Sequence, residues 1–143
     1  MNDYINSLTV EEKIIFLKIF CKLIKADGVI DSEEVNFLKS IASSYGIDNN
    51  TIVSIIKSSN SINTEYEASK ITDRKKALQL VRELCLLANL DEDLNDVELD
   101  IIIDVARAMN IEDDKIILIN RFVLDNLILA KTGRIIMEEN DDE

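Results

Sequence analysis

Three times in this sequence, a residue that can cap a helix is followed three positions later by glutamate and then by apolar residues at helical spacing. The pairs are Thr9 with Glu12, Asp31 with Glu34, and Asn95 with Glu98. In such a capping box, each of the two side chains satisfies a backbone N–H that the first helical turn leaves free. The chain contains no proline and only three glycines, so few residues interrupt the helices between these starts. The sequence therefore predicts an all-α fold.

The apolar pattern predicts a compact bundle of about six to seven helices in a single domain, residues 1–137. The expected helices span about 10–26, 32–45, a short segment capped by Asp48 or Asn50 and reaching Ile56, 73–88, 96–109 and 113–131. Residues 58–72 are polar and aperiodic, which predicts a link consisting of a loop with at most one helical turn after it. Residues 138–143 are acidic, which predicts a disordered tail.

The two halves of the chain align without gaps at an offset of 64 residues. Cys21 then falls on Cys85, Asp27 on Asp91, and Glu34 on Glu98. Helical periodicity alone can match apolar positions, but it does not require the cysteine pair or the shared acidic turn. The alignment predicts two pseudo-symmetric helical hairpin repeats, about 9–57 and 73–131.

Charge and composition exclude several classes of function. The formal net charge is -12, which repels phosphate backbones and anionic lipids, so we expect no nucleic-acid partner and no membrane insertion. The chain has no histidine, the commonest general base, and no glycine-rich phosphate loop. Cys21 and Cys85 lie on apolar stripes, which favours buried, reduced thiols over ligands. Together with a start that lacks an export signal, the cysteines predict a cytoplasmic protein that is not an enzyme.

The acidic turns before the second and fifth expected helices hold the candidate metal ligands. A calcium-binding EF-hand does not fit the first turn, because placing Gly28 at the sixth loop position puts Leu23 and Lys25 at the first and third. Capping accounts for Asp31 and Glu34 without any ion. It leaves Asp27 unexplained, since this residue precedes the box by four positions, as Asp91 does in the second half. A capped, solvated turn and a site for a divalent cation with carboxylate ligands both remain open on the residues alone.

These residues also carry a resemblance. A helix ending in Ala-Asp-Gly, then an aliphatic residue, Asp-x-x-Glu, an apolar helix and Gly-Ile, followed by a degenerate second copy, resembles the tellurite-resistance TerB-like family over about residues 9–130. The resemblance implies a helical bundle with internal pseudo-symmetry that acts in bacterial tellurite and chemical-stress responses. It also implies coordination of a divalent metal ion of unknown identity by Asp27, Asp31 and Glu34 and, in the second copy, by Asp91 and Glu98.

The second copy departs from the family pattern, with Glu92 in place of the glycine and Asn95 in place of the aspartate. We therefore expect the second turn to bind a metal less well than the first. The alternative function is a protein-protein interaction or scaffold domain whose acidic face binds a basic protein without any metal. Residues 73–143 carry most of the excess negative charge, and this half suits such a partner best. A homo-oligomer is also compatible with the sequence.

Overall fold

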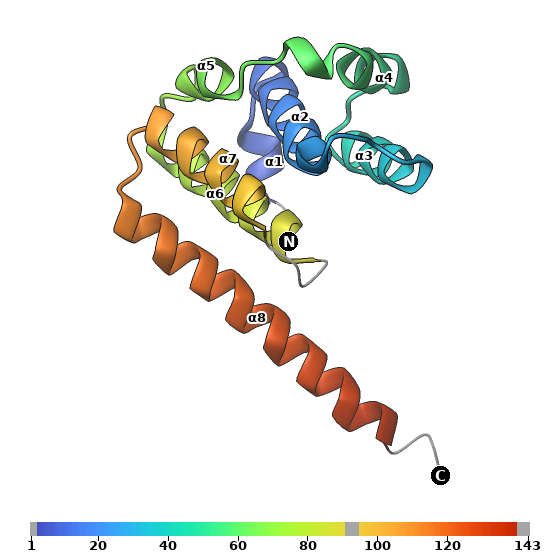
Figure 1. The fold of residues 1–143 in the computed structure, drawn as a ribbon, viewed down its shortest axis with the longest axis vertical. Coiled ribbons are helices and arrows are strands. Elements are labelled where there is room, and N and C mark those ends of the chain that lie inside the picture. Colours follow the sequence, from blue (N-terminus) through green and yellow to red (C-terminus); the bar gives the residue numbers. More distant parts are fainter. Residues whose placement is uncertain (1–2, 91–94, 140–143) are drawn as a thin grey trace.

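The computed structural model describes residues 3–90 and 95–139, and within these ranges the chain is helical without strands (Figure 1). Eight α-helices and two short 3-10 helices follow one another in the described ranges. They are α1 (Asp3–Ser7), α2 (Val10–Ile24), η1 (Lys25–Asp27), α3 (Ser32–Ser44), α4 (Asn49–Lys57), η2 (Ser59–Ser61), α5 (Thr64–Ser69), α6 (Arg74–Asn89), α7 (Asp96–Ala108) and α8 (Asp113–Glu139). The predicted all-α class is confirmed, and α1 is a helix that the sequence pattern did not predict.

The three predicted capping boxes are present and set the starts of α2, α3 and α7. At the start of α3, Asp31 Oδ1 accepts a hydrogen bond from the Glu34 backbone N–H at 2.8 Å, and Glu34 Oε1 accepts one from the Asp31 N–H at 3.0 Å. Asn95 and Glu98 form the same pair of bonds at α7. Asp48, rather than Asn50, caps α4.

Helix α2 forms the centre of the core. Seven of its fifteen residues are buried, and Phe16, Leu17 and Ile19 have no exposed surface. It contacts α3, α4, α5, α6 and α7, and Figure 1 shows these helices grouped around it. A helix buried over so much of its circumference needs neighbours on several sides, which explains why its apolar stripe is wider than that of a surface helix.

Two helices at the predicted repeat offset, α3 and α7, share local features. Helix α7 has the length of α3 and lies 64 residues later, and both helices end in the same turn. The backbone N–H of Ile47 donates to the Ala42 carbonyl at 2.9 Å, as that of Ile111 does to Ala106. Gly46 and Asn110 stand at the matching left-handed positions, with φ of 73° and 61°, and asparagine is one of the few other residues that tolerate this conformation. The pseudo-symmetric arrangement of the two halves in space stays a prediction.

The predicted link, residues 58–72, differs from the expected loop because two of its polar side chains are buried. Ser59 is 1% exposed, and its hydroxyl accepts a hydrogen bond from Lys25 Nζ at 3.1 Å. Glu67 of α5 lies within 3.5 Å of the ammonium groups of both Lys18 and Lys70. These contacts hold η2 and α5 against α2, so the segment is part of the bundle.

The last helix also differs from the expectation. Helix α8 continues to Glu139 rather than ending near Lys131, so the first two residues of the expected acidic tail are helical. Residues 140–143 lie outside the described residues. Figure 1 shows α8 leaving the bundle along its second half.

Both thiols should resist modification in the native protein. Cys21 and Cys85 are free and buried, and burial raises the pKa of Cys21 and raises that of Cys85 to about 12. Because only the thiolate reacts and the bundle must open to expose it, we expect a disulfide reagent at pH 8 to label both slowly. The labelling rate, measured by mass spectrometry, should rise steeply when urea is added. Rapid labelling without denaturant would contradict the assignment.

Candidate acidic site and neighbouring cavities

The first acidic turn connects α2 to α3 through η1. The backbone at Gly28 has a φ of 107°, a conformation that residues with a side chain rarely adopt, and its N–H donates to the Lys25 carbonyl at 2.8 Å. This turn reverses the chain so that Asp31 can start α3. The glycine therefore has a structural role that is independent of any ligand.

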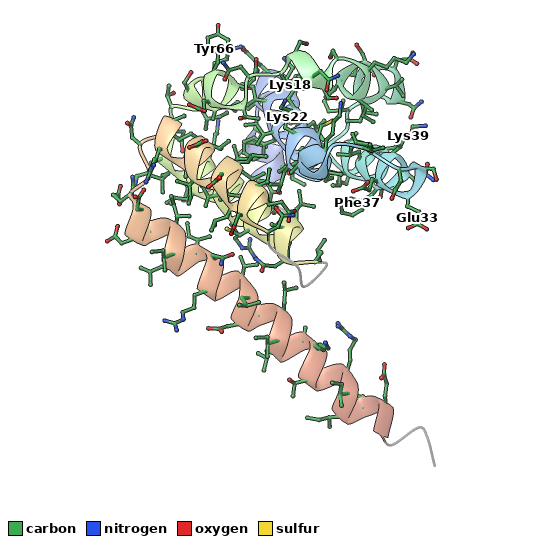
Figure 2. All side chains as sticks on the ribbon, viewed as in Figure 1. Lys18, Lys22, Glu33, Phe37, Lys39 and Tyr66 are labelled. Carbon is green, nitrogen blue, oxygen red and sulfur yellow. The ribbon has the colours of Figure 1, made fainter. Side chains whose placement is uncertain are left out.

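The acidic residues at the start of α3 line an open cavity of about 360 Å³. Asp31, Glu33 and Glu34 form its acidic side, and its apolar side consists of Ile24, Phe37, Leu87 and Leu90. Figure 2 shows Glu33 and Phe37 extending from the same side of α3. The cavity is thus bounded by both halves of the chain, because Leu87 and Leu90 belong to the end of α6.

The structure brings together some of the predicted metal ligands and leaves others outside its description. Asp31 and Glu34 lie side by side in one capping box, and Glu98 has the equivalent position in α7. The side chain of Asp27 and the whole of Asp91 lie outside the described residues. Among the side chains that are described, no group of three or more acidic or cysteine residues could hold a metal ion.

Described residues on both sides of the second acidic turn lie near the first turn. Helix α7, which follows the second turn, contacts η1 in the first turn. Leu90, the last described residue before the second turn, lines the same cavity as Asp31. The packing of α6 and α7 against α2 therefore brings the end of α6 and the helix α7 to the first acidic turn.

A second cavity, of about 260 Å³, lies beside the first and shares Phe37, Leu87 and Leu90 with it. Its polar side is a cluster that the sequence analysis missed. The Tyr4 hydroxyl donates to Glu83 Oε1 at 2.8 Å and lies 2.8 Å from the Tyr45 hydroxyl. These residues come from α1, α6 and the end of α3, and no local motif links them.

Burial of the two tyrosines should make the fold sensitive to alkaline pH. Burial raises the pKa of Tyr4 and raises that of Tyr45 from 10.0 to about 12. A group whose pKa is raised in the folded state contributes its full stabilisation below its unfolded-state pKa. This stabilisation is lost as the pH rises through the folded-state pKa. We therefore expect the free energy of unfolding to fall between about pH 10 and 12.

This loss should be smaller in Tyr4→Phe and Tyr45→Phe, as measured by urea denaturation across this pH range. Tyr66→Phe is the matched control, because Tyr66 is 60% exposed, and it should behave like the wild type. If the free energy of unfolding falls equally in the wild type and the three variants, the cluster of Tyr4, Tyr45 and Glu83 does not cause the alkaline sensitivity.

Comparison with known proteins agrees with the pattern of acidic turns in a helical bundle. A family model described as "Tellurite resistance protein TerB" matches residues 16–121. The chain belongs to the TerB family. The match includes both capping boxes of the acidic turns, most of α2 and the first third of α8. No curated protein and no solved structure matches the chain. Within the described part of this TerB-family chain, no helix has the length and apolar character to cross a membrane.

Replacing Asp31 by alanine should lower stability whether or not a metal is present. The substitution removes the hydrogen bond to the Glu34 N–H, and losing such a cap costs about 1 kcal/mol. Urea denaturation in the presence of a chelator measures this cost. Asp48→Ala removes the equivalent bond to Thr51 at α4 and should cost a similar amount. An unchanged midpoint for Asp31→Ala would contradict the capping assignment.

Proposed function

We propose that this TerB-family protein is a non-enzymatic bacterial stress-response module that binds a divalent metal ion through its acidic turns. Asp27, Asp31 and Glu34 form the principal site, and Asp91 and Glu98 contribute a weaker one. The observation that carries the proposal is that the two capping bonds occupy only one carboxylate oxygen each, Oδ1 of Asp31 and Oε1 of Glu34. Both carboxylates border an open cavity, so an ion can approach them.

The charge of the turn supports a cation despite its location at the start of a helix. The end of the helix dipole there is equivalent to roughly half a positive charge, which opposes cation binding. Three carboxylates outweigh it, and Glu33 adds a fourth at the cavity wall. Carboxylate oxygens are the ligands that calcium and magnesium prefer. Cys21 and Cys85 are buried, and the chain has no histidine, so the donors at the turn are oxygen atoms.

The state of the described tyrosines and thiols favours a binding role. The hydroxyls of Tyr4 and Tyr45 in the neighbouring cavity have raised pKa values and so do not act as bases near neutral pH. Burial likewise keeps the thiols protonated. A binding module needs only a stable scaffold and an accessible charged surface.

Isosteric variants test the metal site. Asp27→Asn removes a ligand charge while keeping its shape, so it should weaken metal affinity at least tenfold and leave the stability of the metal-free protein nearly unchanged. Asp91→Asn should have a smaller effect. Asp48→Asn is the control, because Asp48 caps α4 with the same bond geometry but lies outside both turns.

Isothermal titration calorimetry with calcium, magnesium, manganese and zinc measures these affinities. The metal proposal is wrong if the wild type binds none of these metals at millimolar concentration. It is also wrong if the wild type and all three variants give the same isotherm, since the turns are then capped helix starts.

The cavity also supports the alternative function, an interaction module for a basic protein. Phe37 is 41% exposed and Leu90 is 49% exposed beside Asp31 and Glu33. Such a surface suits a partner segment with both a cationic and an apolar side chain. Glu33→Lys separates the two functions, because Glu33 is not a proposed metal ligand. With a chelator present, Glu33→Lys should abolish binding of the basic partner. It should change the metal affinity of the turn less than Asp27→Asn does.

A further inference from the structure

Helix α8 exposes more apolar surface than any other described helix. Nine of its large apolar side chains are between 40% and 70% exposed: Ile117, Leu118, Phe122, Leu124, Ile128, Leu129, Ile135, Ile136 and Met137. The side of α8 that faces the bundle is narrow, and it extends only as far as Leu127. Ile116 and Val123 are buried, Leu127 is half-buried, and all the described side chains from Ile128 to Glu138 are exposed. Contiguous apolar surface on this scale marks an interaction site.

The second half of α8 lacks the contacts that normally stabilise a helix. Helices shorter than about 12–15 residues are marginal in water without tertiary packing, and Figures 1 and 2 show this half projecting away from the other helices. The chain exposes 8835 Å², whereas a compact monomer of 16.2 kDa should expose about 7,500 Å². The excess of about 1,300 Å² shows that the chain is less compact than a typical monomer of its mass, as expected for a projecting helix.

Leu118, Phe122, Leu129 and Ile136 lie in one row along α8, here called the outer stripe. Their positions follow the four-three spacing of a coiled-coil seam, with Asp125 and Thr132 filling the two remaining positions. The buried residues Ile116 and Val123 lie on another side of the helix, and only the inner end of the outer stripe borders a pocket with α6. Its members are 55–70% exposed.

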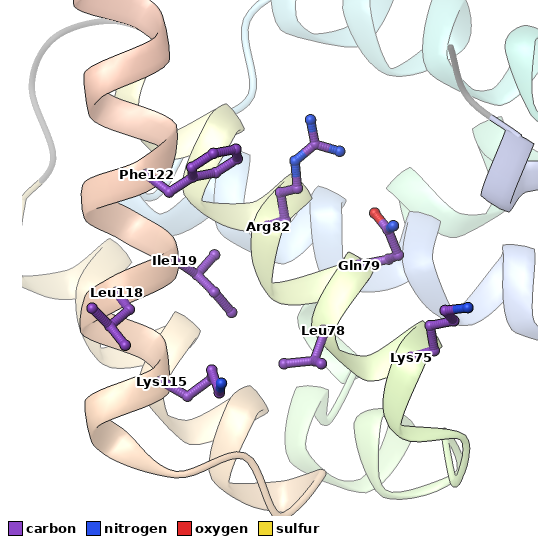
Figure 3. Close-up of a pocket in the computed structure, with 8 residues that line it drawn as sticks. All are labelled: Lys75, Leu78, Gln79, Arg82, Lys115, Leu118, Ile119 and Phe122. Atoms are coloured by element: carbon purple, nitrogen blue, oxygen red, sulfur yellow. The ribbon is translucent and has the colours of Figure 1, made fainter.

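A basic pocket adjoins the inner end of the outer stripe. It has a volume of about 380 Å³, with Lys75, Arg82 and Lys115 around an apolar floor that includes Leu118 and Phe122. Figure 3 shows these residues along α6 and α8. Three cations gathered at one pocket are unusual in a chain of net charge -12, and they suit an acidic segment. The far end of α8 is acidic from Glu138 onward.

We propose that the protein forms a homodimer in which the outer stripes of two α8 helices pack against each other in antiparallel orientation. Each α8 then carries Glu138 toward the basic pocket of the other copy. Pairing Leu118 with Ile136 of the partner subunit brings Lys115 close to the partner's Glu138. An isologous contact of this kind satisfies both copies at once and closes after two subunits. Asp125 and Thr132 interrupt the apolar row and restrict the register, as single polar residues do in coiled coils.

Two adjacent substitutions test the stripe. Leu129 belongs to the outer stripe and Ile128 does not. Ile128 is a matched control because both side chains are largely exposed, by 70% for Leu129 and 55% for Ile128. Leu129→Asp should weaken dimerisation at least tenfold, and Ile128→Asp should leave it within about twofold. Sedimentation equilibrium of the full chain in a chelator measures the dissociation constant, and circular dichroism checks that both variants keep their helicity. Equal weakening by the two variants would overturn the proposed seam.

Charge reversal tests the register. Lys115→Glu and Glu138→Lys should each weaken the dimer several-fold, and the double variant should recover much of the loss, since it restores opposite charges across both symmetric contacts. A wild-type protein that remains monomeric at high micromolar concentration, or a double variant weaker than either single one, would overturn the proposal. All these measurements are made without metal, so their outcome is independent of the acidic turns.

Discussion

The burial of α2 fixes the arrangement of the bundle. Its apolar residues contact helices from both halves of the chain, and Phe16, Leu17 and Ile19 are fully enclosed. The polar residues of α2 contribute as well, because Lys18 pairs with Glu67 and Glu12 pairs with Lys76 at 2.8 Å. These contacts hold α5 and α6 beside α2. The position of the first acidic turn follows from this packing, since η1 directly continues α2.

The acidic residues of the turns combine a structural role with the proposed functional one. Capping requires an oxygen acceptor at Asp31 and at Asn95, and the boxes add Glu34 and Glu98. These residues would be needed at the helix starts of a protein with no ligand. A metal site at this place therefore adds to a capped turn and does not replace it. The residues that distinguish the two roles are Asp27 and Asp91, which precede the capping boxes by four positions in the sequence.

The charge distribution gives the molecule two different surfaces. The cavity at the start of α3 combines carboxylates with Phe37 and Leu90, whereas the pocket between α6 and α8 combines three cations with an apolar floor. The basic pocket of an acidic protein can pair with the acidic end of a second copy. The proposed antiparallel pairing of α8 does so and leaves the acidic cavity accessible to a cation or a basic partner.

Local chemistry in the sequence was sufficient to predict the helical class, the three capping boxes, the buried thiols and the family. Caps and helical periodicity depend on residues within a few positions of one another, so they can be read without knowledge of the tertiary structure. Only the tertiary structure placed Ser59 and Glu67 in contact with α2, because their partners Lys25 and Lys18 are distant in sequence. The cluster of Tyr4, Tyr45 and Glu83 escaped the sequence analysis for the same reason. Exposure of the outer stripe was likewise decided by packing, since the bundle covers a single narrow face of α8 and apolar periodicity alone does not reveal which faces of a helix are covered.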